Sequence, residues 1–373
     1  SAHVSIVAFQ KLQPDSDREV LQMRHCRSAS IMLLLCATTA APVASAIEPV
    51  PDRSGWHGFV LVGAGYLDLK SSMVAGNDLI DIGKRTIASI NDGAQSDSVV
   101  HPLVTGEINY TFGDHWQAFL GTSLEDFVTL DGVEQLGLRK QAPGVGILQG
   151  AFLFSGIPSR VWEDPYQEGV PRHDTDRKST GMRFQWDRIL GSAVELTFTY
   201  RAIRIDTERS GQGVTSVTCD SVCQGLLRRD GDQYSVAASY LFMPGDGRRH
   251  LLRPMVRYTM NDRDGAAVSS DGYRFQLTYS FIGDGYTFVG NVAAGSTSQD
   301  EPNPLYGVRT DADQFAVDAS LFYRLPAASR RWQAVAGIRW GEDNSTVDFH
   351  DNEVFGVTLA VMYLFGTPPS SRQ

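Results

Sequence analysis

The hydrophobic residues of this chain recur at every second position over most of its length, a spacing typical of β-strands with one apolar face. The clearest run lies near the carboxy terminus, where smaller or less bulky residues separate Phe355, Val357, Leu359, Val361, Tyr363 and Phe365. A strand with one strongly apolar face, one milder face and an aromatic end suits a closed barrel in a membrane.

Counting such segments predicts fourteen strands, with twelve or sixteen as alternatives. An even number brings both ends of a bacterial barrel to the periplasm. The strands are expected near residues 56–67, 103–112, 116–124, 134–141, 146–154, 180–187, 194–202, 233–242, 252–260, 272–281, 286–294, 314–323, 332–340 and 354–365. The predicted fold is all-β, a transmembrane antiparallel up-and-down β-barrel whose last strand pairs with its first.

Alternation alone does not separate a membrane barrel from a soluble sandwich, which also buries one face of each sheet. Three further features favour the barrel: aromatic residues cluster at strand ends, long and short connections alternate, and the amino-terminal region resembles an export signal. The long connections span roughly 69–101, 155–179, 203–231 and 295–312, and the short ones 113–115, 282–285 and 324–331. Long outer loops and tight inner turns are the outer-membrane arrangement.

Composition excludes two other classes of protein. The 373 residues are 42% hydrophobic, yet no run of eighteen apolar residues occurs outside the amino-terminal region, which argues against helical membrane spans. The net charge of −10 argues against nucleic acid, whose phosphates require an excess of Lys and Arg on one face.

The amino-terminal region has the features of a secretory signal peptide. A basic start at residues 24–27 precedes an apolar core at 31–37, and Ala44-Ser45-Ala46 resembles a cleavage site. We therefore expect the following layout: an upstream extension at 1–22 that precedes the natural start, a signal peptide at 23–46, a short periplasmic segment at 47–54, the barrel at 55–365 and a periplasmic tail at 366–373.

The four cysteines divide into two pairs. Cys26 and Cys36 lie in the predicted signal peptide; Cys36 also raises the alternative of a lipoprotein, although the preceding Leu35 does not suit that site. Cys219 and Cys223 remain, and an exported protein meets an oxidising periplasm, so we predict a local disulfide between them. Their spacing, without further Cys or His nearby, is poor for zinc.

The phase opposite to the apolar one holds charged and amide side chains that a barrel would direct into its lumen. The candidate pore-lining residues are Glu107, Arg183, Glu195, Arg253, Arg257, Arg274, Asp318 and Arg339. Opposed charges across a constriction would select solutes. Alternatively, these residues pair with one another and only make a polar interior stable.

Other chemistry is weakly supported. Glu163, Asp164, His173, Asp174 and Asp176, or Asp348, His350 and Asp351, place carboxylates beside His, but loops of this composition are usually only solvated. Clustered carboxylates at 342–353 and 300–313 could attract Ca²⁺ or Mg²⁺, or simply form an acidic surface. We expect no enzyme activity and no cofactor, and leave a metal site open.

Several short motifs occur in a fixed order along the chain: Trp56-His-Gly58, Gly63-Ala-Gly65-Tyr66, Asn109-Tyr-Thr-Phe-Gly113, Phe119-Leu-Gly-Thr-Ser123, Trp162-Glu-Asp-Pro-Tyr166, Arg229-Asp-Gly-Asp232 and the closing strand. In these motifs the chain resembles a family of porin-like Gram-negative outer-membrane barrels, domain of unknown function 2860. The resemblance implies an outer-membrane barrel and carries over no functional residue.

The function expected from the sequence is a passive outer-membrane channel for small hydrophilic solutes. The alternative is a closed barrel with a structural role or a role in surface and lipopolysaccharide interaction, and a more distant one is an outer-membrane hydrolase. Expected partners are outer-membrane lipid, lipopolysaccharide and the barrel assembly machinery, but not nucleic acid; the oligomeric state stays open. Residues 47–54 are too few for a plug, so any occlusion would come from infolded loops.

Overall fold

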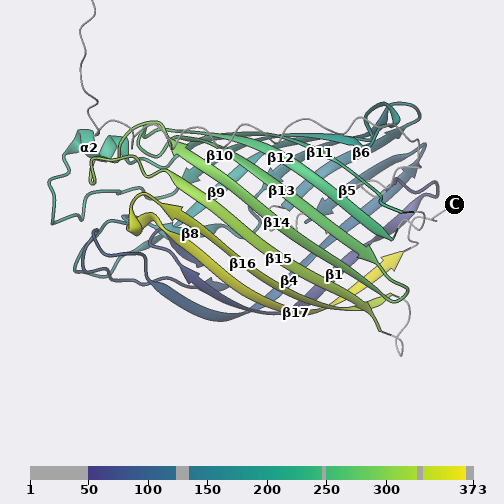
Figure 1. Ribbon diagram of the computed structural model, residues 1–373, viewed down its shortest axis with the longest axis horizontal. Coiled ribbons are helices and arrows are strands. Elements are labelled where there is room, and N and C mark those ends of the chain that lie inside the picture. The colour runs from purple at the N-terminus through teal and green to yellow at the C-terminus, as the bar shows by residue number, and fades with distance from the viewer. Residues whose placement is uncertain (1–48, 123–133, 246–248, 326–330, 367–373) are drawn as a thin grey trace, which may run out of the picture. The chain divides into compact units, whose positions relative to one another are not determined.

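The computed structural model describes residues 49–122, 134–245, 249–325 and 331–366, all within one compact unit of residues 43–373 (Figure 1). The predicted signal peptide at 23–46, with Cys26 and Cys36, lies outside the described residues, as do the expected extension at 1–22 and residues 367–373 of the tail. Among the described residues, no helix is long and apolar enough to cross a lipid bilayer.

Fourteen antiparallel strands form a closed barrel, because β17 pairs with β1 as well as with β16. They are β1 (Gly55–Lys70), β4 (Ser96–Gly113), β5 (Trp116–Gly121), β6 (Glu134–Ala142), β7 (Gly146–Phe154), β9 (Asp174–Asp187), β10 (Val194–Ile205), β11 (Gly231–Tyr240), β12 (His250–Arg263), β13 (Ser270–Ile282), β14 (Tyr286–Gln299), β15 (Ala312–Arg324), β16 (Trp332–Ser345) and β17 (Asn352–Gly366). Three short strands, β2 (Val74–Asn77), β3 (Ile80–Asp81) and β8 (Ser159–Trp162), lie in the connections.

The predicted strand count and the pairing of the last strand with the first are confirmed. Phe59 lies opposite Leu364, and the ladder continues to Lys70 opposite Glu353. The strands run further than predicted at the end that carries the long loops: β9 begins at Asp174 rather than near residue 180. The added residues of β9, 174–179, are polar on both faces, as expected beyond the lipid, so their hydrophobic pattern is weak.

The outward face of the barrel is apolar on every strand. Its exposed side chains include Val62, Val104, Leu120, Leu138, Phe152, Phe184, Phe198, Val236, Val256, Phe275, Val292, Leu321, Ile338 and Leu359. Such a continuous apolar surface would be unstable in water and marks the region in contact with lipid.

Aromatic pairs border this apolar surface at both ends of the strands. At the end with short turns, Trp56 contacts Tyr110 with ring centroids 4.8 Å apart, and Trp332 contacts Tyr363 at 4.7 Å. At the end with long loops, matching pairs are Tyr200–Tyr234 at 5.2 Å and Tyr258–Tyr273 at 5.0 Å. The aromatic girdles expected from the sequence are therefore present at both membrane interfaces.

An apolar patch lies on the inward face beside the closing seam between β1 and β17. Leu61 is fully buried against Phe59, Phe322, Val335 and Met362, which come from strands that neighbour the seam. These side chains fill part of the interior next to the strands that meet last, and they stabilise the closure by removing apolar surface from water.

The connections gather at opposite ends of the barrel according to their length (Figure 1). The long loops, with β8 and the short helix α2 (Ser221–Leu226), lie at one end, and the carboxy-terminal end of β17 lies at the other. In an outer-membrane barrel the long loops are extracellular and the short turns periplasmic.

The barrel interior and its outer loops

One wall of the interior is built around Arg139 on β6. Its guanidinium donates to both carboxylate oxygens of Glu107 at 3.2 Å and to the side-chain oxygens of Asn109 at 3.2 Å, Gln117 at 3.0 Å and Gln149 at 2.6 Å. All five side chains are buried. Because every strong acceptor around the arginine has a donor, the charges are held in a rigid network inside the barrel.

The network extends in two directions along the same wall. The amide nitrogen of Gln117 lies 3.0 Å from Nε2 of His57 on β1, and that of Gln149 donates to Gln185 on β9 at 3.3 Å. The guanidinium of Arg139 also lies over the ring of Phe119, 4.1 Å from its centroid. One network of polar side chains therefore links strands β1, β4, β5, β6, β7 and β9.

Arg139 was not among the predicted pore-lining residues, although it binds four neighbouring side chains in the interior. The alternation of Gln135, Gly137, Arg139 and Gln141 against Leu136 and Leu138 carries the signal. Lys140 obscures that signal, because it places a charge on the outward phase, where its ammonium lies 5.0 Å from the ring centroid of Trp116. Long basic side chains reach the interface in this way.

The predicted residues on the opposite wall fall into three groups. Glu195 lies 4.0 Å from Arg253, and Asp318 on β15 is the cross-strand partner of Arg339 on β16. Arg257 and Arg274 are direct partners on β12 and β13. The predicted Glu107 lies apart from these groups and binds Arg139, while Arg183 is buried on β9.

Neutral polar side chains link these groups across strands. Asn291 donates to Asp318 at 2.8 Å and accepts from Thr278 at 2.5 Å. Asp318 is also within electrostatic range of Arg274 and Arg339. The charges of this wall therefore neutralise one another in part, as one of the two interpretations of the sequence anticipated.

Parts of the barrel interior differ in their contact with solvent. On β4 to β9 the inward polar side chains of Glu107, Gln117, Arg139 and Gln185 are buried, with 8% exposure or less. Inward positions of β12 are half-buried along the whole strand, and Arg274 in the middle of β13 is exposed. Since Tyr273 and Phe275 on either side face outward, at 66% and 50% exposure, the solvent around Arg274 lies inside the barrel.

The extracellular loops form a second structural unit with its own hydrophobic core, which we call the loop core. Its buried members come from five different loops: Ile87 and Ile90 from residues 71–95, Tyr166 from 155–173, Cys223 and Leu227 from 206–230, Leu305 from 300–311 and Phe349 from 346–351. The rings of Tyr166 and Phe349 stack at 5.6 Å between centroids.

The loops that meet in this core start from opposite sides of the barrel. The 71–95 loop connects β1 to β4, whereas the 206–230 loop connects β10 to β11, six strands away around the closed sheet. Contacts between them must cross the mouth of the barrel. The loop core therefore lies across the extracellular entrance, which is where the sequence-based expectation placed any occlusion by infolded loops.

Buried carboxylates hold the loops together through backbone amides. Glu168 accepts bonds from the backbone N–H of Ile90 at 2.9 Å and from the N–H and hydroxyl groups of Thr215 and Ser216 at 2.8–2.9 Å. Burial would raise the pKa of this carboxyl, but these hydrogen bonds prevail and lower its pKa to about 2. One side chain thus connects three loops.

Arg172 makes the corresponding basic contact. It donates to the carbonyl oxygens of Ser72 at 2.8 Å and Pro165 at 2.9 Å and to that of Lys84, and its guanidinium lies 4.4 Å from the ring centroid of Trp162. Burial lowers the pKa of Arg172 to about 10, so it stays charged at neutral pH. The strand pair β2–β8 reinforces the same junction between the first and third loops.

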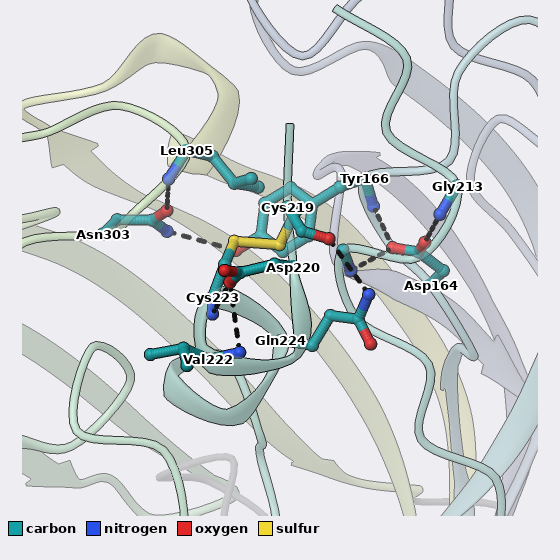
Figure 2. The surroundings of a disulfide bond; sticks show 11 residues. Asp164, Tyr166, Gly213, Cys219, Asp220, Val222, Cys223, Gln224, Asn303 and Leu305 are labelled. Atoms are coloured by element: carbon teal, nitrogen blue, oxygen red, sulfur yellow. Dashed lines mark hydrogen bonds between the residues drawn. A yellow bond between two sulfur atoms is a disulfide. The ribbon is translucent and has the colours of Figure 1, made fainter. Parts of the chain in front are cut away.

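The predicted disulfide between Cys219 and Cys223 is present and lies at the edge of the loop core (Figure 2). It joins the residue before the helix cap to the first turn of α2. Asp220 caps the amino terminus of this helix by accepting from the N–H groups of Val222 and Cys223. Asp164 acts similarly nearby, accepting from the N–H of Tyr166 at 3.0 Å and of Gly213 at 2.6 Å. The disulfide thus staples a loop, as the sequence indicated.

The candidate catalytic residues have structural contacts. Glu163 pairs with Arg209 at 3.4 Å, and Asp174 lies between Arg85 and Arg160 at 3.5 Å from each. His350 is buried in the loop core, where burial lowers its pKa to about 4. Glu163, Asp174 and His350 thus take part in separate contacts between loops, whereas His173 is exposed.

The acidic loops are also partly occupied by contacts within the chain. Asp351 accepts from the backbone N–H of Ser345 at 2.9 Å, and Asp311 accepts from that of Gln299 at 2.7 Å. Within the described residues, no group of three or more His, Cys, Asp or Glu side chains is arranged to hold a metal ion.

A closed barrel with an apolar outward belt, two aromatic girdles, a polar interior and long loops at one end defines a porin-like transmembrane β-barrel of the Gram-negative outer membrane. The chain belongs to the family described as "Protein of unknown function (DUF2860)", whose model matches residues 55–364. This match confirms the family that the sequence motifs resemble.

Solved structures of outer-membrane barrels are similar to the chain. A channel of Pseudomonas putida F1 shares 10% identity with a TM-score of 0.41, covering 86% of this chain and 100% of its own. The channel DcaP of Acinetobacter baumannii shares 9% identity with a TM-score of 0.39, covering 84% and 97%. OmpT of Vibrio cholerae shares 11% identity with a TM-score of 0.39, covering 83% and 98%. Likeness at this level says nothing of activity, and no curated protein matches the chain.

Proposed function

We propose that the barrel is a channel for the passive diffusion of small hydrophilic solutes. The observation that carries the proposal is the solvent exposure of Arg274 on the inward face of β13, together with the half-buried inward positions of β12. Side chains that fill a closed barrel completely would bury such positions. A solvated strip along β12 and around Arg274 on β13 gives hydrophilic solutes a polar surface to follow.

The loop core supports the rival function, a closed barrel with a structural or surface-interaction role. It crosses the extracellular entrance and is held by buried hydrogen bonds, so it restricts passage there. In the proposed channel, this core narrows the entrance and limits solute size. In the rival, it forms a seal whose outer surface is the functional part.

Single-channel recording separates the two. Purified, refolded protein is placed in a planar lipid bilayer, and current steps are recorded in several salts. Steps above the background of protein-free bilayers are the expected result. Their absence, for protein whose folding is verified by heat-dependent gel migration, would overturn the channel proposal.

A loop-core variant tests how the entrance is limited. Tyr166→Ala removes a ring at the centre of the loop core, at 2% exposure, and is expected to raise the single-channel conductance while leaving the barrel folded. The matched control is Tyr286→Ala on the outward face at the periplasmic end, where the conductance should not change. Equal conductance of wild type and Tyr166→Ala would show that the loop core does not limit the current.

A further inference from the structure

Arginines are concentrated on one wall of the barrel interior. The five fully described strands β9 to β13 carry seven of them at inward positions, Arg177, Arg183, Arg201, Arg253, Arg257, Arg263 and Arg274. The same inward positions hold two carboxylates, Asp187 and Glu195. This wall is therefore strongly basic, although the whole chain has a net charge of −10.

The remaining wall does not carry a matching acidic excess. On the inward positions of the other nine barrel strands, all described, four carboxylates are present, Asp97, Glu107, Asp318 and Asp343. They share these positions with three arginines, Arg139, Arg324 and Arg339. Glu107 is bound by Arg139, so its charge does not reach the basic wall. The barrel interior as a whole is positive, and the excess is located on β9 to β13.

Arg257 and Arg274 form the centre of this wall. They are direct cross-strand partners, and like charges in that position repel each other. The flanking inward positions carry no acid: Met255 and Thr259 lie on one strand, and Gly272 and Gln276 on the other. The next inward neighbours are small, Ala237 on β11 and Gly295 on β14.

The small neighbours explain why Arg274 is accessible. Gly272 and Gly295 have no side chains to cover its guanidinium, which is exposed to solvent within the barrel. Asp318 and Asp343, on the more distant strands β15 and β16, lie within its electrostatic range. Two adjacent guanidinium groups with planar, forked donors are suited to a carboxylate or phosphate group.

We propose that the basic wall of β9 to β13 makes the barrel selective for anions, with Arg257 and Arg274 as an anion-binding site along the path. The solute class is small molecules that carry carboxylate or phosphate groups. The inference rests on the proposed channel function and specifies its substrate class. The basic wall raises the local concentration of anions. The arginine pair binds them, and because the site is exposed to solvent, bound anions can dissociate again.

Reversal potentials under a KCl gradient test the selectivity. Wild type is expected to pass Cl⁻ in preference to K⁺, and the double variant Arg257→Glu with Arg274→Glu is expected to reverse that preference. The matched control Arg204→Gln removes an arginine from the outward phase of β10 and should leave the reversal potential unchanged. Cation selectivity of the wild type, or an unchanged reversal potential in the double variant, would overturn the proposal.

Binding of inorganic phosphate tests the site even if no current is observed. Isothermal titration of the detergent-solubilised wild type is expected to detect binding that weakens by roughly fivefold for each arginine replaced, in Arg257→Gln and Arg274→Gln. Arg204→Gln should bind as wild type. Absent current with intact, arginine-dependent phosphate binding would reject the channel but keep the site, whereas phosphate binding that is absent or independent of both arginines would reject the site.

Discussion

The hydroxyl oxygen of Tyr166 and Nε2 of His350 lie 3.4 Å apart in the loop core, although 184 positions separate the two residues in the chain. Their rings lie 5.9 Å apart, beside Phe349 and Tyr306. Both groups are kept in their neutral forms by burial, which raises the pKa of Tyr166 to about 12 and lowers that of His350 to about 4. An apolar centre with neutral polar groups thus connects the third and last loops.

Acid is expected to loosen the loop core through His350. Between about pH 6.5 and pH 4 an undocked loop binds a proton that the packed imidazole does not, so the stability of the loop core falls as the pH is lowered. The loss amounts to roughly 3 kcal/mol at most once the pH is below 4. Hydrogen exchange of the loop amides at pH 7.5 and pH 5, corrected for intrinsic rates, should show faster opening at pH 5.

The variant His350→Phe serves as the control for that experiment. It keeps an aromatic ring in the apolar site and removes the titrating group, so the difference between pH 7.5 and pH 5 should shrink. Glu168 does not interfere in this window, because its stabilising effect is lost only below about pH 4.5. An unchanged pH dependence in His350→Phe would assign it to another group.

Glu168→Gln is expected to loosen three loops together. The amide cannot accept all the bonds that Ile90, Thr215 and Ser216 donate, and each orphaned buried donor costs about 1–3 kcal/mol. Limited proteolysis at neutral pH should then cut the 71–95 and 206–230 loops faster than in wild type. Glu301→Gln, an exposed carboxylate in the 300–311 loop, is the matched control and should be cut at the wild-type rate.

Removing the disulfide should have a local effect only. The double variant Cys219→Ser with Cys223→Ser removes a cross-link that restricts the unfolded chain. For so short a loop, the chain-entropy model gives a loss of roughly 2 kcal/mol in the free energy of unfolding. We expect faster hydrogen exchange around α2 and unchanged heat-dependent gel migration, since the barrel wall does not include these residues. If the barrel failed to assemble without the disulfide, the expectation that the disulfide stabilises only the loop around α2 would be wrong.

Closure of the barrel should depend on a small residue at Gly63. A Cβ at this position would lie 2.2 Å from the carbonyl oxygen of Leu359 and 2.5 Å from the Cβ of Ala360, across the β1–β17 seam. Gly63→Val is therefore expected to reduce the folded fraction seen by heat-dependent gel migration. Gly150→Val on β7, where a Cβ meets nothing within 4 Å, should fold as wild type.

Breaking the interior network at Arg139 should destabilise the barrel. Arg139→Met leaves the buried carboxylate of Glu107 without its cation, at a cost of about 3 kcal/mol. Urea unfolding in detergent, followed by intrinsic fluorescence, should show the lower midpoint. The double variant with Glu107→Gln removes the stranded charge and is expected to recover part of the loss; no recovery would mean that Arg139 acts through its packing on Phe119.

The sequence was sufficient for the wall of the barrel because period-two alternation depends only on neighbouring residues. Leu359 and Val361 illustrate this. Their shared phase in the alternation predicted that both face lipid, and both side chains are exposed on the outward face. The pairing of β17 with β1 followed because a closed sheet has no free edge. The disulfide followed from spacing and compartment.

The loop core could not be predicted from the same pattern. Ile87, Tyr166 and Phe349 are isolated apolar residues in polar loops, and their contacts join segments far apart in the chain. The pairing of charged side chains inside the barrel was only partly predictable. Alternation shows which face of its strand a residue occupies, but not which residues lie beside it on the neighbouring strands. Arg139 with Glu107 is the clearest example.

The contact between the β1–β4 and β10–β11 loops has a mechanical consequence. A fourteen-stranded cylinder held only by its ladder of hydrogen bonds could flatten into an ellipse under lateral tension in the membrane. The loop core joins opposite sides of the outer rim, so it keeps them at a fixed distance and resists that flattening. Among the described residues of the inner rim, no comparable core joins the short turns, so tension would deform the periplasmic end of the lumen first.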